Sequence, residues 1–264
     1  MNLGLEGKLA VVSGSTAGIG FGIASALAAE GAHVVVNGRT EERVTRAMDH
    51  LRKEHKGAQV RGVAADLGTA EGVAKFIRQI PEADILVNNL GIFEVRPFQE
   101  ISDPDWTRFF EVNVLSGVRL TRHYLPAMLR KNWGRVIFIS SESGQQIPTE
   151  MIHYGMTKTA QISIARGVAQ TVTGTGVTVN SVLVGPTASE GAAAFVKQFA
   201  KQQGITEEQF EKRFFVEARP TSLLKRFETT KEIGEVVAFV ASAQANVING
   251  AAVRAEGGVL TSIL

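Results

Sequence analysis

The chain has 264 residues, of which 44% are hydrophobic and 20% are charged, and its formal net charge at pH 7 is +2. This composition supports one large hydrophobic core, and the small net charge excludes the strongly basic surface that nucleic acids or anionic membranes would bind. The sequence contains no cysteine, which excludes disulfides and thiolate chemistry, and no apolar run marks a signal peptide or membrane span, so we expect a cytoplasmic protein without a metal site.

Seven short apolar runs alternate with helical patterns along the chain. Runs rich in valine and isoleucine are typical of buried parallel strands, and crossover helices connect such strands. We predict helices over residues 21–30 and 112–130, and further helices that begin near Asp103, Thr206 and Thr229. The expected fold class is α/β, a doubly wound seven-stranded parallel sheet with helices on both faces, in a single domain. The predicted strands are residues 9–14, 33–38, 60–66, 84–91, 135–141, 176–185 and 250–258.

The first predicted strand runs into a glycine-rich turn and then into a helix. Glycines at such a junction let the backbone approach the pyrophosphate of a dinucleotide, which the amides and dipole of the helix N-terminus stabilise. The alternative is a turn that only packs the strand against the helix. Within the sequence Ser13-Gly-Ser-Thr-Ala-Gly-Ile-Gly20, we predict cofactor contacts from Gly14, Ser15, Thr16, Gly18, Ile19 and Gly20.

An arginine follows the second predicted strand, in the sequence Asn37-Gly38-Arg39-Thr40. At this place an acidic side chain would hydrogen-bond the adenosine ribose and select NAD, whereas a guanidinium group suits the 2′-phosphate of NADP. We therefore predict a preference for NADP, with NAD as the alternative cofactor. The competing interpretation is that Arg39 is an exposed loop residue, because Ala17 gives the glycine-rich turn no second basic partner.

The third and fourth predicted strands end at the same crevice, because the carboxyl ends of parallel strands share one edge of the sheet. Asp66 and Leu67 end the third strand, and Asn88 and Gly91 follow from the fourth. We predict that these four residues contact the dinucleotide. Asparagine side chains at such a place also tie neighbouring loops together, which is the structural alternative for Asn88.

A tyrosine and a lysine lie four residues apart in the sequence Tyr154-Gly-Met-Thr-Lys158. On a helix this spacing places both side chains on one face, so that an ammonium group lies near a phenol. A nearby positive charge favours the phenolate, so we expect the pKa of Tyr154 to lie below its usual value of about 10. The pair is then suited to general acid–base catalysis, although the spacing alone also occurs on solvated helix faces.

The fifth predicted strand ends in Ser140-Ser141-Glu142-Ser143, shortly before Tyr154. A hydroxyl group at the carboxyl end of a strand can lie beside that tyrosine across the crevice, and the spacing favours Ser141 over its neighbours. Asn113 lies at the start of the helix predicted over 112–130, where a polar residue satisfied at a helix bend is the structural alternative.

Five motifs, in this order and spacing, resemble the short-chain dehydrogenase/reductase family over essentially the whole chain. Each motif alone is weak, but five in register are specific, and the terminal Ala255-Glu256-Gly257-Gly258 is similar to the last strand of that family. The resemblance implies a Rossmann-type fold, an NAD(P) cofactor and a homo-oligomer, either a dimer or a tetramer. The motifs are Ser13-Gly-Ser-Thr-Ala-Gly-Ile-Gly20, Asn88-Asn-Leu-Gly91, Asn113, Ile139-Ser-Ser141 and Tyr154-Gly-Met-Thr-Lys158.

The same resemblance implies a role for each catalytic candidate. Tyr154 would donate a proton to a carbonyl oxygen, and Lys158 would lower the pKa of that tyrosine and bind the nicotinamide ribose. Ser141 would hydrogen-bond the same carbonyl oxygen. The backbone of Asn113 would hold a water beside the lysine in a proton relay, while hydride passes between the nicotinamide and the substrate carbon.

Two departures from the family pattern concern the cofactor. The Pro-Gly that usually follows strand six is replaced by Val184-Gly185-Pro186, so we expect Gly185, together with Thr187 or Ser189, to bind the nicotinamide amide. Leu90 replaces the usual alanine after the two asparagines. It is a bulkier neighbour for the adenosine half, which we expect the site to accommodate.

Residues 188–227 form an insertion-like segment within the single domain of residues 1–264. The segment resembles the substrate lid of the family, whose apolar face closes over a hydrophobic substrate and excludes water. Packing against the body or another subunit is the alternative for each of its phenylalanines. His153 points about 100° away from Tyr154 on the helix, so we expect a packing or outward-facing histidine and not a second acid. The phenylalanines are Phe195, Phe199, Phe210, Phe214 and Phe215.

The sequence therefore predicts an NADP-preferring oxidoreductase that interconverts a ketone and a secondary alcohol. A 3-oxoacyl thioester reductase and a sugar or polyol dehydrogenase both belong to that class. The rivals are a lyase or epimerase that uses the same tyrosine and lysine, and a non-catalytic dinucleotide sensor, which the presence of both residues disfavours. The expected partner is a small carbonyl or alcohol substrate, and neither nucleic acid nor a membrane.

Overall fold

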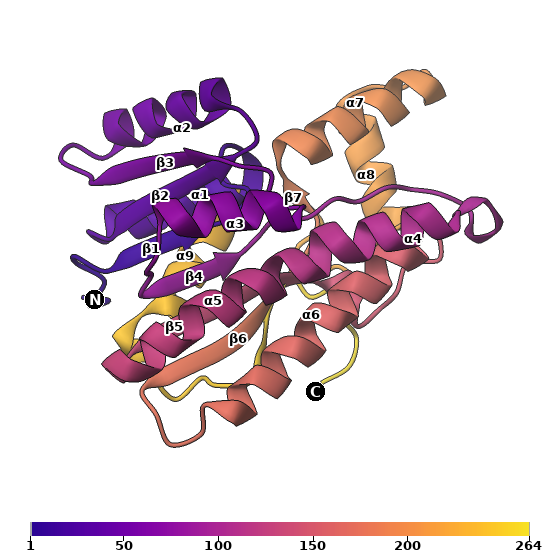
Figure 1. Cartoon of the computed structure of the whole chain (residues 1–264). Helices are drawn as coiled ribbons and strands as arrows, with labels where there is room; N and C mark the ends of the chain where they lie inside the picture. The colour runs from indigo at the N-terminus through magenta and orange to yellow at the C-terminus, as the bar shows by residue number, and fades with distance from the viewer. Residues whose placement is uncertain (1, 264) are drawn as a thin grey trace.

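The structure is a computed structural model that describes residues 2–263, with the exception of the side chain of Phe195. Within these residues seven parallel strands form one sheet in the order β3-β2-β1-β4-β5-β6-β9, which confirms the predicted single-domain α/β fold (Figure 1). The strands are β1 (Leu9–Val12), β2 (His33–Gly38), β3 (Val60–Ala64), β4 (Ile85–Asn88), β5 (Gly134–Ser141), β6 (Val177–Val184) and β9 (Ala252–Ala255). Several predicted strands extend further than these, because their last residues leave the sheet to form the turns at its carboxyl edge.

Helices cover both faces of the sheet. Helices α1, α2 and α9 bury apolar side chains against one face, and α3, α5 and α6 bury theirs against the other (Figure 1). No helix of the described residues is both long and apolar enough to cross a membrane. The helices are α1 (Gly18–Ala29), α2 (Glu41–Glu54), α3 (Ala70–Gln79), α4 (Asp103–Phe110), α5 (Ser116–Lys131), α6 (Ile152–Thr171), α7 (Glu190–Gln203), α8 (Glu207–Glu217) and α9 (Thr230–Ala241).

The predicted helix starts are confirmed by side-chain caps. The side chains of Ser102, Thr206 and Thr229 accept hydrogen bonds from backbone amides in the first turns of α4, α8 and α9. The helix predicted over 112–130 belongs to a longer helical run, because a π-helical turn, Glu111–Leu115, joins α4 to α5. Such π-helical turns occur frequently at functional sites, and this one carries Asn113.

Helices α1 and α9 approach each other through two glycines. A Cβ atom at Gly22 would lie 2.3 Å from the carbonyl oxygen of Thr230, and one at Gly234 would lie 2.3 Å from the carbonyl oxygen of Gly22. No side chain fits at either place. This contact holds the first crossover helix against the sheet and so positions the turn that precedes α1.

The order in which successive strands are added to the sheet reverses at β1. Strand β1 pairs with β2 on one side and with β4 on the other, so the segments that follow β1 and β4 leave in different directions. Ligands bind at such a switch point in doubly wound folds. Helices α7 and α8 lie at the same carboxyl edge and project beyond the sheet (Figure 1), and the short strands β7 (Thr187–Ala188) and β8 (Glu228–Thr229) pair at their base.

Candidate active site

A cleft of about 250 Å³ lies between the glycine-rich turn after β1 and the loop after β4. Gly14 and Gly18 have φ angles of 62° and 59°, which is the left-handed region that favours glycine. A Cβ atom at Gly20 would lie 2.4 Å from the carbonyl oxygen of Gly14, so the turn closes only around a glycine. All three residues line the cleft, as does Ile19.

The N-terminus of α1 borders this cleft and carries no negative charge. Its N-cap residue, Ala17, provides no side-chain hydrogen bond, and its first turn contains no acidic residue. The first amides and the positive end of the helix dipole are therefore available to an anionic group. The glycine-rich turn and this helix end together fit the pyrophosphate of a dinucleotide.

The structure separates the predicted cofactor residues into those that face the cleft and those that hold its walls. The hydroxyl of Ser15 is buried, donates to the carbonyl of Val12 and accepts from the amide of Asn37, so it ties the turn to β2. Asn88 is also buried and donates to the hydroxyl of Thr121. These two side chains point away from the cleft, where the sequence motif predicts contacts.

Asn89 lines the cleft and was not among the predicted cofactor residues. Its side-chain amide donates to the carbonyl oxygens of Ser13 and Gly14, each at 3.0 Å, and so fixes the glycine-rich turn to the end of β4. The signal was available in the alternation of strand side chains. If Asn88 points into the sheet layer, the next asparagine points to the opposite side.

Arg39 lies at the end of β2 with an exposed side chain that forms no hydrogen bond or ion pair with the described residues. A Cβ atom at Gly38 would lie 2.5 Å from Cγ2 of Thr16, so the segment that carries Arg39 lies directly against the glycine-rich turn. Asp66 is exposed and accepts from the amide of Gly68, whereas Leu67 is buried. Among Arg39, Asp66 and Leu67, only Arg39 thus offers an unpaired, exposed charge to a cofactor phosphate.

Tyr154 and Lys158 project from α6 toward this cleft, and both line it. The ammonium group of Lys158 is buried, donates to the carbonyl oxygen of Ile139 at 2.8 Å and to Oε1 of Gln161 at 3.3 Å, and lies 5.5 Å from the centre of the Tyr154 ring. Ser140 supports this position because its hydroxyl donates to the carbonyl oxygen of Lys158.

Asn113 is buried in the π-helical turn and holds the loop after β4 close to α6. Its side chain accepts from the amide of Ile92 at 2.8 Å and donates to the hydroxyl of Thr157 at 3.0 Å. Its carbonyl oxygen accepts from Nε2 of Gln161 at 2.6 Å. Gln161 thus connects Asn113 to Lys158, a role that no motif in the sequence indicated, because it depends on two helices meeting at this turn.

Burial decides the pKa values of the tyrosine and lysine. It raises the pKa of Tyr154 to about 12, against a smaller lowering by a hydrogen bond to Ser141, and it lowers the pKa of Lys158 to about 8. The expectation that the pKa of Tyr154 lies below its usual value of about 10 is therefore wrong. Burial of the phenol is the largest cause of this shift, and the ammonium group of Lys158 is directed to Ile139 and Gln161.

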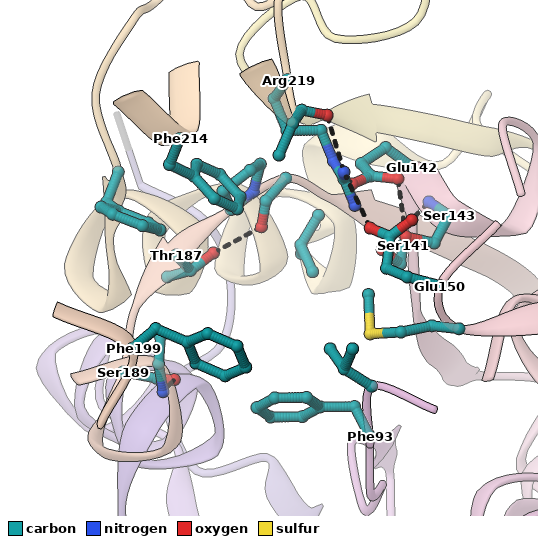
Figure 2. Close-up of a pocket in the computed structure, with 18 of the residues that line it drawn as sticks. Phe93, Ser141, Glu142, Ser143, Glu150, Thr187, Ser189, Phe199, Phe214 and Arg219 are labelled. Carbon is teal, nitrogen blue, oxygen red and sulfur yellow. Dashed lines mark hydrogen bonds and ion pairs between the residues drawn. The ribbon is translucent and has the colours of Figure 1, made fainter. Parts of the chain in front are cut away.

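A second cavity, of about 470 Å³, adjoins the cleft. Tyr154 lines both spaces, and Ser141 lines the larger one. Figure 2 shows Phe93 and Phe199 on one side of the larger cavity, with Glu142 and Arg219 across from them. Phe214 lies beside Arg219, whose guanidinium carbon is 5.8 Å from the centre of the Phe214 ring. The ring of Phe93 packs edge-on against Tyr154, with the ring centres 6.4 Å apart.

The predicted lid segment supplies much of the apolar wall of the larger cavity. Phe199, Phe210 and Phe214 line it, and they belong to a small hydrophobic cluster of their own around α7 and α8. Phe215 is buried and contacts Phe214 and Phe227, while the side chain of Phe195 lies outside the described residues. His153 is also buried, against Phe109, which agrees with the expected packing role.

The loop after β6 carries the predicted nicotinamide contacts. Gly185, Thr187 and Ser189 line the larger cavity, and Ser189 also lines the cleft and caps α7. The hydroxyl of Thr187 donates to the carbonyl oxygen of Gly185 at 3.0 Å. A buried carboxyl group, Glu228, accepts from the amide of Gly185 at 3.2 Å and holds the loop from the β8 side.

We expect the Glu228→Gln variant to be more stable than the parent at pH 8 and nearly equal to it at pH 5. Burial raises the pKa of Glu228 to about 7, so the folded protein holds a proton that the unfolded chain releases at lower pH. The contribution of this carboxyl group is full at low pH and is lost as the pH rises through 7. Thermal unfolding should show a gain of about 2 kcal/mol at pH 8.

The matched control for this variant is Glu235→Gln, which changes an exposed glutamate on α9. It should alter the melting temperature by the same small amount at both pH values. An equal effect of Glu228→Gln at pH 5 and pH 8 would contradict the assignment of the buried proton to Glu228.

Known proteins resemble this chain over its full length. A family model for short chain dehydrogenase matches residues 8–200. The uncharacterized oxidoreductase YvaG of Bacillus subtilis is 49% identical, with 100% of each chain covered. D-beta-hydroxybutyrate dehydrogenase of Cupriavidus necator is 32% identical over 96% of this chain and 98% of its own. The crystal structure of L-sorbose reductase from Gluconobacter frateurii, complexed with NADPH and L-sorbose, has a TM-score of 0.94 at 30% identity and covers 100% of both chains.

Proposed function

This chain belongs to the short-chain dehydrogenase/reductase family, an oxidoreductase family, and we propose that it interconverts a ketone and a secondary alcohol with a preference for NADP. The observation that carries the proposal is the position of Tyr154, which lines both the cleft beside the glycine-rich turn and the larger cavity. A phenol at the junction of a dinucleotide cleft and a substrate cavity can donate a proton to a carbonyl that receives hydride from the cofactor.

In this account the chain moves a proton and orients the substrate. The bound nicotinamide supplies the hydride. Tyr154 keeps its proton at neutral pH, because burial raises its pKa to about 12, and donates it to the substrate oxygen. Ser141 hydrogen-bonds the same oxygen and aligns it with the phenol. Lys158, fixed by Ile139 and Gln161, presents its charge to the ribose and stabilises the negative charge that Tyr154 acquires.

The glycine-rich turn, the end of α1 and Arg39 would hold the cofactor. Gly14, Gly18 and Gly20 allow the backbone to approach the pyrophosphate, and Arg39 is free to bind a 2′-phosphate. The preference for NADP rests on this arginine and on the NADPH named for the sorbose reductase.

We expect Arg39→Asp to lower kcat/KM for NADPH by about 10- to 100-fold, because a charge-assisted hydrogen bond to the 2′-phosphate is lost and a repulsive charge takes its place. The value for NADH should stay the same or rise. Initial rates with both cofactors measure the effect. Arg46→Asp, which changes an exposed arginine of α2, is the matched control and should leave the NADPH to NADH ratio unchanged.

The segment 188–227 acts as the lid in this proposal. Its phenylalanines cover the larger cavity opposite Ser141, so closure of α7 and α8 excludes water from the reacting carbonyl. The relatives include an L-sorbose reductase and a 3-oxoacyl-[acyl-carrier-protein] reductase, so the family alone leaves open both a sugar or polyol and a 3-oxoacyl thioester.

NADPH oxidation against a panel of ketones tests the proposal. Net oxidation, with one secondary alcohol formed per NADPH consumed, is the expected result. An epimerase would return its hydride and leave the NADPH concentration unchanged. A dinucleotide sensor would bind NADPH without any turnover, so either of these results would contradict the proposal.

A further inference from the structure

A buried ion pair lies in the larger cavity, immediately after the proposed catalytic serine. Nε of Arg219 donates to Oε1 of Glu142 at 2.8 Å, and the two side chains are 10% and 4% exposed. Both residues line the cavity (Figure 2). Glu142 directly follows Ser141 at the end of β5, whereas Arg219 comes from the segment after α8. The pair therefore joins the lid segment to the catalytic strand end.

Each member of the pair is held on its far side. Oε2 of Glu142 accepts from the hydroxyl of Ser143 at 2.7 Å, and Nη1 of Arg219 donates to the carbonyl oxygen of Ala218 at 2.8 Å. Nη2 of Arg219 has no hydrogen-bond acceptor among the described residues, and it is not one of their fully enclosed atoms, so it remains accessible. Removing two charges from water costs free energy. Because this ion pair lines the substrate cavity and leaves one donor unused, we take a group of the substrate as its further partner.

The charges around the pair disfavour an anionic substrate group. Glu150 places a second carboxylate 3.6 Å from Nη1 of Arg219, and Glu217 and Arg213 of the same cavity neutralise each other. The guanidinium group thus faces two carboxylates, and the cavity lining carries one more negative than positive charge. A carboxylate or a phosphate of the substrate would have to compete with Glu142 and Glu150 for Arg219.

The charges of Glu142 and Arg219 also disfavour an unsubstituted acyl chain as the substrate group that contacts them. An apolar chain against Glu142 and Arg219 would remove the remaining water from both and offer no hydrogen bond in return. A hydroxyl group donates one hydrogen and accepts through two lone pairs, so it can donate to a carboxylate and accept from a guanidinium group together. The apolar rings of Phe93 and Phe199 on the opposite side suit the carbon skeleton of the same molecule (Figure 2).

We propose that the Glu142–Arg219 pair is the specificity-determining element of this site and binds the hydroxyl groups of a neutral polyhydroxylated ketone. The inference rests on the proposed carbonyl reduction and adds its substrate class. The pair also lies close enough to affect the reacting tyrosine electrostatically, because Glu142 raises the pKa of Tyr154 and Arg219 lowers it. Tyr154 and Ser141 line the same cavity as the pair, so a substrate held by the pair can present its carbonyl to them.

Three ketones of four carbons test this assignment with NADPH. They are erythrulose, which carries three hydroxyl groups, 2-butanone, which carries none, and acetoacetate, which carries a carboxylate. The parent protein should reduce erythrulose with a kcat/KM at least about 10²-fold above that for 2-butanone, as expected for a site built to bind substrate hydroxyls. Acetoacetate should be the poorest substrate. A higher kcat/KM for acetoacetate than for erythrulose would overturn the proposal.

The double variant Glu142→Gln/Arg219→Met separates recognition from the intrinsic reactivity of a hydroxyketone. It removes both charges together, so that neither remains buried without a partner. The ratio of kcat/KM for erythrulose to that for 2-butanone should fall by about tenfold or more, mainly through KM for erythrulose. An unchanged ratio would overturn the proposal.

A control double variant and two measurements of folding accompany this test. The matched control is Glu208→Gln/Lys212→Met, which makes the same two replacements in an exposed ion pair on α8 and should leave the ratio unchanged. NADPH binding and the melting temperature report whether the double variant folds, and if it does not, the three-ketone comparison in the parent decides. NADPH oxidation with 2-butanone and erythrulose at equal efficiency would overturn only the substrate assignment, whereas no oxidation with any of the three would overturn the proposed function as well.

Discussion

Replacing Tyr154 with phenylalanine is expected to lower kcat for ketone reduction by about 10²- to 10⁴-fold, because the proposed proton donor is removed. The Kd for NADPH should change little, since the ring remains and only the hydroxyl is lost. Single-turnover absorbance of NADPH at its reduced-nicotinamide band, with binding followed separately by fluorescence, measures the two quantities.

Tyr124→Phe is the matched control, since the chain contains two tyrosines and both are at least half-buried. The hydroxyl of Tyr124 donates to the carbonyl oxygen of Ile80 at 2.7 Å, and Tyr124 lines neither the cleft nor the larger cavity, so we expect its loss to affect stability and not turnover. Retention of kcat within a small factor in Tyr154→Phe would show that another group supplies the proton.

Replacing Lys158 with methionine is expected to weaken NADPH binding and to lower kcat together, by about 10²-fold or more in kcat/KM. The ammonium group is the buried positive charge between the carbonyl of Ile139 and the cofactor cleft, and methionine fills its volume without the charge. Steady-state rates over a range of NADPH concentrations measure the loss.

The lowered pKa of Lys158 leads us to expect that kcat/KM of the parent enzyme depends on pH. Burial lowers the pKa of Lys158 to about 8, so the charged form exists below that pH and is lost as the pH rises through it. The kcat/KM for NADPH should therefore fall above about pH 8 in the parent, and this decline should be absent in Lys158→Met. Lys75→Met, which removes a lysine that donates to the carbonyl of Ala64 on β3, should keep the decline. A parent profile that stays flat to pH 10 would contradict the role of Lys158.

The fold was predictable because buried parallel strands are read directly from apolar runs. Val34, Val35 and Val36, for example, are all fully buried in β2, so both faces of the strand carry the same signal. The ends of the strands were less predictable. Residues such as Gly14 and Gly91 continue an apolar run but leave the sheet, and only the pairing of neighbouring strands determines where that happens.

The catalytic candidates were predictable because their spacing is local, whereas their electrostatics were not. Tyr154 and Lys158 share a helix face for reasons of helix geometry alone. The raised pKa of Tyr154 depends on burial beneath other elements, which no spacing contains. Glu142 and Arg219 lie 77 residues apart and belong to no motif, so their pairing appears only when the segment after α8 folds back on β5.

The cofactor residues divide in the same way. Glycines with positive φ, such as Gly14 and Gly18, are dictated by the turn and were found from the motif. Ser15 and Asn88 were assigned to the cofactor by their place in a motif, yet their side chains point into the protein. A motif indicates which positions matter. Whether a side chain at a strand end contacts the cofactor or holds the turn depends on the direction in which it points, and the motif does not contain that direction.

Transfer of deuterium from NADPH to the substrate distinguishes net hydride transfer by this protein from epimerisation and from cofactor binding alone. NADPH that carries deuterium at both C4 positions of the nicotinamide is incubated with erythrulose and the enzyme, and the product is examined by mass spectrometry. The account predicts a tetrol with one deuterium on the former carbonyl carbon and one NADP formed per alcohol. A product without deuterium, or unchanged NADPH beside converted substrate, would contradict it.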